Sequence, residues 1–212
     1  MMARQAQEDR AALRRNYQSG YKALVMVALP VAVLTSFTAP ALIGILGGQA
    51  FLPEGAIALQ IMIWSIPIGW INSLTQYVLI ALDRQRQITG IFVLAVSFNV
   101  LGNLLFLPRY SYQAAAVTTI LSEMVLLAGF LWLLRHELGR VTLLRTLWRP
   151  VVATLVMLAC LAVVWPWQPL LALLVASAVY VLGLGLLRPL TAEEGQRLAR
   201  IVPTPLLRWV VQ

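Results

Sequence analysis

Glu123 is the only ionisable side chain in a membrane-length apolar stretch that runs from Gln113 to Leu134. A carboxyl near the middle of a bilayer disfavours insertion by about 2.5 to 3.5 kcal/mol, so an acid at this depth is by default a candidate functional residue. No Lys or Arg lies within any apolar stretch of comparable length in this chain. Glu123 must therefore be protonated, hydrogen-bonded to Asn or Thr, or hydrated. Two roles remain open for it, a functional intramembrane acid and a neutral bond between helices.

Polar residues recur at helical spacing in the same part of the sequence. Ser65, Gly69, Asn72 and Gln76 follow one another at steps of four, three and four, which places them on one helix face. The next stretch has Asn99 and Asn103 one turn apart, and the one after it has Thr119 and Glu123 one turn apart, beside Ser122. Such groups either bridge neighbouring helices or line a hydrated cavity. The candidate cavity residues are Asn72, Gln76, Asn99, Asn103, Thr119 and Glu123.

Three prolines interrupt the apolar stretches that must position these groups. Pro30 and Pro40 lie in the first stretch and Pro67 lies in the second. A proline lacks the N–H that bonds one turn back, so it can bend a helix and release a carbonyl that only a cavity or a neighbouring helix could satisfy. We predict helix bending at all three positions.

Composition identifies the class of protein. Of 212 residues, 60% are hydrophobic and 11% are charged, and the mean hydropathy of +0.82 is that of an integral membrane protein. Six stretches are long enough to cross ~30 Å of hydrocarbon as helices. The predicted fold is an all-α membrane protein whose six crossings are Ala23 to Gly47, Ala56 to Leu82, Ile88 to Pro108, Gln113 to Leu134, Val151 to Trp165 and Leu170 to Leu187.

Basic residues predict the orientation. With the N-terminus inside, every Lys and Arg except Arg109 falls on the cytoplasmic side, as the positive-inside tendency favours. The net charge of +8 is then topological information, and a nucleic-acid partner loses its support. We expect a multi-pass protein of a bacterial-type cytoplasmic membrane, in contact with membrane lipid, with both termini cytoplasmic.

The same pattern divides the chain into five segments. Residues 1–22 form a basic cytoplasmic segment, 23–134 four membrane helices, 135–149 a basic cytoplasmic loop, 150–188 a peripheral helix pair, and 189–212 a cytoplasmic amphipathic tail. Two tryptophans and two prolines between Trp165 and Pro169 predict the turn within the pair. Thr191 and Glu194 form a capping box that would open a helix in the tail.

Enzymatic and metal-binding readings find little support in the sequence. His136 is the only histidine and lies in the basic loop, and no metal-ligand spacing or nucleotide-binding glycine motif is present. We therefore expect no enzyme, no metal and no cofactor.

One block of sequence carries a resemblance. Asn99-x-x-x-Asn103 leads to Pro108-x-Tyr110, then to Ala114-Ala-Ala-x-Thr118-Thr119 and Ser122-Glu123. This block resembles the O-antigen type polysaccharide flippase family of the multidrug/oligosaccharidyl-lipid/polysaccharide exporter superfamily. The chain departs from that family's pattern at Ser111 and Ala114, where glycine is usual, and at Thr118, where alanine is usual.

The resemblance implies a fold and a function. The six crossings would correspond to the C-terminal lobe and the final helix pair of a flippase of about fourteen helices, which passes a lipid-linked oligosaccharide across the membrane by alternating access. On that reading the substrate is the lipid-linked oligosaccharide. A lone half could not enclose a path, so we expect an N-terminal-lobe partner chain or a homodimer. The alternative is a non-transporting membrane scaffold or subunit in polysaccharide assembly.

Overall fold

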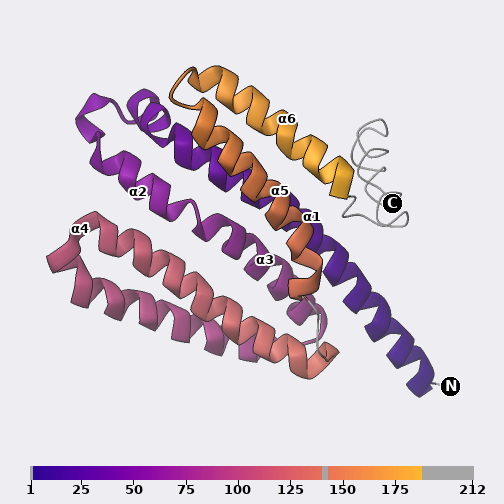
Figure 1. Ribbon diagram of the computed structural model, residues 1–212. Helices are drawn as coiled ribbons and strands as arrows, with labels where there is room; N and C mark the ends of the chain where they lie inside the picture. Colours follow the sequence, from indigo (N-terminus) through magenta and orange to yellow (C-terminus); the bar gives the residue numbers. More distant parts are fainter. Residues whose placement is uncertain (1, 140–142, 188–212) are drawn as a thin grey trace. The chain divides into compact units, whose positions relative to one another are not determined.

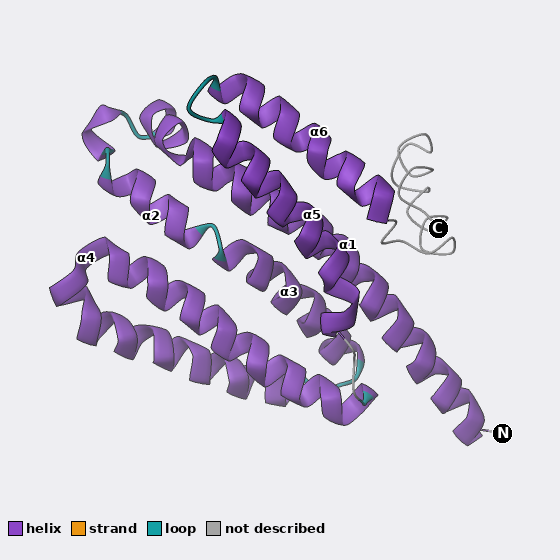
Figure 2. Ribbon diagram, viewed as in Figure 1, coloured by secondary structure: helices purple, strands orange, loops and turns teal. Residues whose placement is uncertain are grey.

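The computed structural model describes residues 2–139 and 143–187, and every regular element in these ranges is helical (Figures 1 and 2). Five spans among these residues are long and apolar enough to cross a membrane. Helices suit such sequences because in lipid each backbone N–H and C=O must be bonded within its own segment. The predicted all-α membrane fold is confirmed. The elements are α1 (Met2–Leu46), the short 3₁₀ helix η1 (Gln49–Phe51), α2 (Glu54–Met62), α3 (Ser65–Ala81), α4 (Gln85–Leu138), α5 (Leu143–Val164) and α6 (Pro169–Leu187).

The third and fourth predicted crossings are the two arms of α4. The backbone of Ser111 has φ 50° and ψ −138°, which reverses the helix, and we call residues 85–110 the first arm and 112–138 the second arm. Figure 1 shows the two arms side by side. The rings of Phe92 and Phe130, at nearly equal sequence distances from Ser111, meet edge to face with centroids 5.6 Å apart. The six predicted crossings correspond to five apolar spans among the described residues, because α4 holds two crossings joined at Ser111 rather than by a longer loop after Pro108.

The second predicted crossing, Ala56 to Leu82, corresponds to one apolar span but consists of two helices, with the interruption close to Pro67, where the sequence predicts bending. α2 ends at Met62 and α3 begins at Ser65. Pro67 is the third residue of α3 and has no N–H to give to the carbonyl of Ile63, which accepts from the N–H of Ile66 at 3.1 Å instead. The break therefore lies one turn before Pro67.

Helical structure extends across predicted segment boundaries, which concern position relative to the membrane rather than secondary structure. α1 runs without interruption through the expected boundary between residues 22 and 23, and Tyr17 and Lys22 are buried. Within the stretch predicted as a basic cytoplasmic loop, residues 135–149, α4 continues to Leu138 and α5 begins at Leu143. The predicted tail at 189–212 lies outside the described residues.

The chain divides into two compact units. One consists of residues 1–24 and 34–141, and the other of residues 25–33 and 142–212. In the second unit α5 and α6 pack against each other, and Met157, Leu161, Ala172 and Ala176 are fully buried. The turn between these helices occupies residues 165–168, where the sequence predicts it. The candidate polar residues all lie in the first unit.

Candidate functional site

Asn72 and Glu123 form the centre of the polar site. The Asn72 Nδ2 donates to Glu123 Oε2 at 2.6 Å and to the Glu123 backbone oxygen at 3.0 Å, joining α3 to the second arm of α4. Asn72 is 3% exposed and Glu123 is half-buried. Both amide hydrogens of Asn72 are thus directed at one residue. The intramembrane carboxyl is met by a neutral donor, one of the three states that the sequence allowed.

The other half of the Asn72 amide has no partner. Its Oδ1 is buried and accepts no hydrogen bond from any described residue. A buried acceptor without a donor lowers the stability of the fold by about 1–3 kcal/mol, so a ligand that donates a hydrogen bond to it would bind favourably. Gly69 lies one turn earlier, and a Cβ built there would stand 3.7 Å from Glu123 Oε2. The absence of a side chain at Gly69 leaves that side of the carboxyl uncovered.

A second network joins the two arms of α4. Asn103 Nδ2 donates to Asn99 Oδ1 at 3.1 Å, Asn99 Nδ2 donates to Ser122 Oγ at 3.0 Å, and Ser122 Oγ donates to the Thr119 carbonyl at 2.8 Å. Asn103 Oδ1, like that of Asn72, is buried and unpartnered. Asn99 and Asn103, one turn apart in the sequence, are therefore in direct hydrogen-bonding contact. This network, like the first, ends on an amide oxygen that accepts no hydrogen bond from the described residues.

The second arm of α4 carries a residue of each network. Ser122 and Glu123 are consecutive, so their side chains leave the helix about 100° apart. Ser122 faces the first arm and Glu123 faces α3, as their partners Asn99 and Asn72 show. The four residues are therefore brought to one level of the first unit by three helical segments.

Two of the predicted site residues stay apart from these networks. Thr119 Oγ1 donates back to the Ala115 carbonyl of its own helix at 2.9 Å, so only its backbone oxygen takes part. Gln76 is half-buried and makes no hydrogen bond with any described residue. Gln76 does keep its place one turn from Asn72 on α3.

The prolines of α1 release carbonyls, as the sequence indicates, but neither interrupts the helix. Pro40 leaves the Ser36 carbonyl without its usual donor, and Gln60 Nε2 of α2 donates to it at 3.0 Å. In the second unit Pro30 similarly frees the Met26 carbonyl, which accepts from the Tyr180 hydroxyl of α6 at 2.6 Å. Each freed carbonyl thus has a side-chain donor from another helix.

A buried hydrogen bond escaped the sequence analysis. The hydroxyls of Tyr17 and Thr75 lie 2.9 Å apart, and both side chains are almost fully buried. Tyr17 was assigned to a cytoplasmic segment, so its partner could not be sought among membrane residues. A signal was present, because Thr75 lies one turn from Asn72 on the face that carries the polar stripe.

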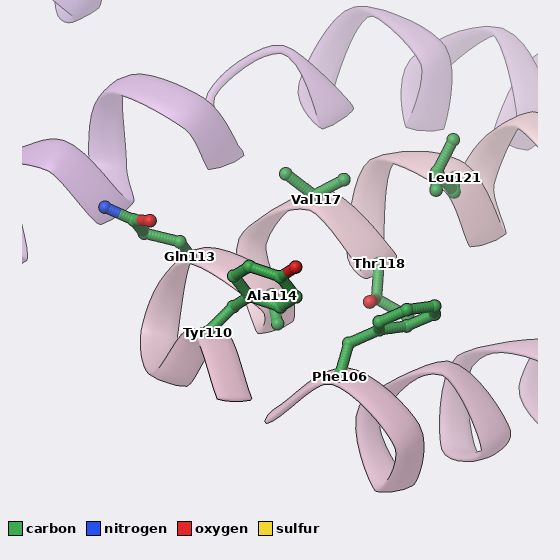
Figure 3. A pocket seen from close by; sticks show the side chains of 7 residues that line it. All are labelled: Phe106, Tyr110, Gln113, Ala114, Val117, Thr118 and Leu121. Atoms are coloured by element: carbon green, nitrogen blue, oxygen red, sulfur yellow. The ribbon is translucent and has the colours of Figure 1, made fainter. Parts of the chain in front are cut away.

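An apolar cavity of about 360 Å³ lies between the arms of α4 near the Ser111 reversal (Figure 3). Its lining comes from both arms and is mostly apolar, consisting of Phe106, Tyr110, Gln113, Ala114, Val117, Thr118 and Leu121. It is separate from the Asn72–Glu123 contact and shares no residue with the second network. Nothing in the sequence analysis predicted it, since it depends on the angle between the arms.

Metal ligation finds no candidate in the described ranges, where no three His, Cys, Asp or Glu side chains gather. The polar site instead offers hydrogen-bond acceptors and one carboxyl. Its chemistry is that of binding neutral donors or a proton.

Comparison with known proteins gives a family and a relative. The family model MatE matches residues 4–105, which include Asn72, Gln76, Asn99 and Asn103 but not Glu123. An uncharacterized membrane protein of Methanocaldococcus jannaschii is 26% identical over 114 residues, which are 54% of this chain and 22% of that protein. The chain thus spans about a fifth of the length of the curated relative it matches. No solved structure matches the chain.

The match concerns the segment that holds α1, α2, α3 and most of the first arm. It supports the exporter superfamily and does not distinguish the polysaccharide flippase branch within it. Members of the MatE family are transporters, which agrees with the expectation of no enzyme. Residues 4–105 of this multi-pass membrane protein are therefore similar to a MatE domain, a domain of an exporter superfamily.

Proposed function

We propose that α3 and α4 form one wall of a polar path, through which a flippase passes the head group of a lipid-linked oligosaccharide by alternating access. In this proposal the chain supplies a part that resembles the C-terminal lobe. It lies in the cytoplasmic membrane with both termini on the cytoplasmic side. The opposite wall comes from a partner lobe or from a second copy of this chain.

The observation that carries the proposal is the pair of buried, unpartnered amide oxygens on Asn72 and Asn103. Both lie in spans that are apolar enough to cross a membrane, and both end a hydrogen-bonded network. Sugar hydroxyls are donors as well as acceptors, so they can satisfy such oxygens as they pass. A wall with these groups binds sugars through many weak contacts, which suits passage better than tight retention.

Each side chain has a part in this scheme. Asn72, Gln76, Asn99 and Asn103 hydrogen-bond the sugar hydroxyls. Glu123 either couples passage to a proton or cation, or holds Asn72 in the orientation that presents its Oδ1. Thr119 contributes through the backbone carbonyl that anchors Ser122.

A scaffold function has one observation in its favour. Asn72 donates both amide hydrogens to Glu123, as a neutral residue that bridges two helices would do. On this second reading the polar residues fix the packing of α3 on α4, and the chain contributes to polysaccharide assembly without transporting anything.

Export in a complemented deletion strain separates the two readings. Glu123→Gln and Asn103→Ala are compared with Ser177→Ala, a polar side chain of α6 that bonds only to the Leu173 carbonyl of its own helix. The transport reading predicts loss of export with the first two variants at an unchanged membrane level, and retention with the third. Normal export with both Glu123→Gln and Asn103→Ala would contradict the transport function and favour the scaffold function.

A further inference from the structure

The reversal of α4 fixes the depth of the cavity beside it. Ser111 joins two apolar helical arms, so this end of the hairpin lies at a membrane surface whichever way the chain is inserted. Arg109, Tyr110 and Tyr112 surround the reversal. Aromatic and basic residues of this kind are enriched at the level of the lipid head groups.

From that surface the cavity extends toward the hydrocarbon core. Its lining on the second arm runs from Gln113 to Leu121, a distance of about 12 Å along the helix, which is less than half of the ~30 Å core. A volume of about 360 Å³ is that of a small ligand site. The cavity therefore has the depth and size for a segment of one lipid chain.

The chemistry of the lining favours hydrocarbon over water. Phe106, Ala114, Val117 and Leu121 present carbon to the cavity, and the hydroxyl of Thr118 is one of few polar groups near it. A water molecule in a cavity needs two to four polar partners, which such a lining does not supply. An aliphatic chain needs none, and it is the group that the surrounding membrane provides.

A cation stands at the surface end of this cavity. Arg109 is exposed, and its guanidinium carbon lies 5.9 Å from the centre of the Tyr110 ring, which itself lines the cavity. Arg109 makes no ion pair with the residues that the structure describes. A guanidinium binds phosphate oxygens in a bidentate manner, and the aromatic contact helps to hold it at this position.

We propose that this cavity is a phospholipid site, in which one acyl chain of an anionic phospholipid lies between the arms of α4 while its phosphate is bound by Arg109. The site goes beyond the proposed transport function, and it exists whether or not the chain transports an oligosaccharide. It attaches a membrane lipid to the hairpin that also carries Asn99, Asn103 and Glu123.

Native mass spectrometry of the full chain, titrated with phosphatidylglycerol in detergent, tests the site. Val117→Trp fills the cavity and should weaken binding at least ~10-fold, because an acyl chain held through several CH₂ groups loses those contacts. Arg109→Gln should weaken it roughly fivefold, the effect of one cation near a membrane phosphate. Leu121→Trp fills the same cavity from its deeper end, and it replaces Val117→Trp in the binding test if that variant does not fold.

Matched controls and partial ligands complete the design. Val93→Trp places the same ring on an exposed face of the first arm, and Arg86→Gln removes an exposed cation from its other end. Both should bind like the wild type. Diacylglycerol with the same chains and glycerol phosphate alone should each bind more weakly than the complete lipid. Wild-type affinity in both cavity-filling variants, equal losses with Val93→Trp, or equal binding of diacylglycerol would overturn the proposal.

Discussion

Asn72 directs both hydrogens of its amide at Glu123, one to the carboxyl at 2.6 Å and one to the backbone oxygen at 3.0 Å. The contact ties the middle of α3 to the second arm of α4 across 51 residues of sequence. With the amide nitrogen directed at Glu123, the amide oxygen of Asn72 accepts no hydrogen bond from the described residues. The bond that holds the helices together therefore creates the free acceptor of the proposed wall.

A double-mutant cycle measures this contact. Asn72→Ala and Glu123→Ala should be coupled by about 0.5–2 kcal/mol in the free energy of unfolding, the range found for hydrogen bonds between membrane helices. Denaturant unfolding in mixed micelles provides the four values. Gln76→Ala combined with Glu123→Ala is the control, since Gln76 lies one turn away without a bond, and this pair should be additive. Additivity of the Asn72 pair would show that the contact does not form.

The proline in the second unit permits a rescue experiment. Tyr180→Phe removes the hydroxyl that donates to the Met26 carbonyl and should lower the free energy of unfolding by about 1–3 kcal/mol. Pro30→Ala restores a backbone N–H one turn from that carbonyl, so adding it to Tyr180→Phe should recover much of the loss. Tyr77→Phe, at an exposed tyrosine, should have little effect. A double variant less stable than Tyr180→Phe alone would contradict this account of Pro30.

Ser111 occupies a backbone conformation that favours glycine. Its φ of 50° lies in the region where a Cβ is strained. Ser111→Gly should raise the free energy of unfolding by about 1 kcal/mol. Ser97→Gly, at an exposed position inside the first arm, should lower it by about 0.5–1 kcal/mol because glycine is a poor helix former. Changes of the same sign at the two serines would exclude the reversal at Ser111.

Two glycines allow the arms of α4 to pack closely. A Cβ at Gly129 would stand 2.5 Å from Ile91 Cγ2, and one at Gly102 would stand 2.7 Å from Thr118 Cγ2. Alanine at either position should lower the melting temperature, through overpacking that costs about 1–3 kcal/mol. Gly90→Ala meets no atom within 4 Å and should be neutral or stabilising. Thermal unfolding of the three variants checks the order, and a destabilised Gly90→Ala with a normal Gly129→Ala would contradict the arrangement of the arms.

Much of the fold follows from the sequence because hydropathy and helix length are local properties. The apolar stretches predict the membrane spans, and the Trp165 to Pro169 cluster predicts its turn. Pro67 predicts a bend in the second crossing, but not that the helix is interrupted one turn earlier, between Met62 and Ser65. The third and fourth crossings follow from hydropathy in the same way, but the joining of their two helical arms through the single residue Ser111 does not.

The candidate site was predicted as a set of residues but not as a set of contacts. Periodicity identifies Asn72, Asn99 and Asn103 as polar positions on helix faces, yet it cannot say which of them meets Glu123. That pairing depends on the rotation of α3 against α4. The same limit applies to Gln60, whose role depends on a carbonyl that Pro40 releases in another helix.

Thiol labelling at matched depths tests most directly whether the polar face of α4 lines a water-filled path. In a Cys160→Ala background, Asn99→Cys and Asn103→Cys are compared with their neighbours Val100→Cys and Leu104→Cys, which face outward and are exposed on the first arm. A membrane-impermeant methanethiosulfonate should label the first two in intact membranes and leave the others unmodified. Equal labelling of Asn99→Cys and Val100→Cys, and of Asn103→Cys and Leu104→Cys, would contradict a water-filled path. The hydrogen-bonded networks would then serve only to hold the helices together.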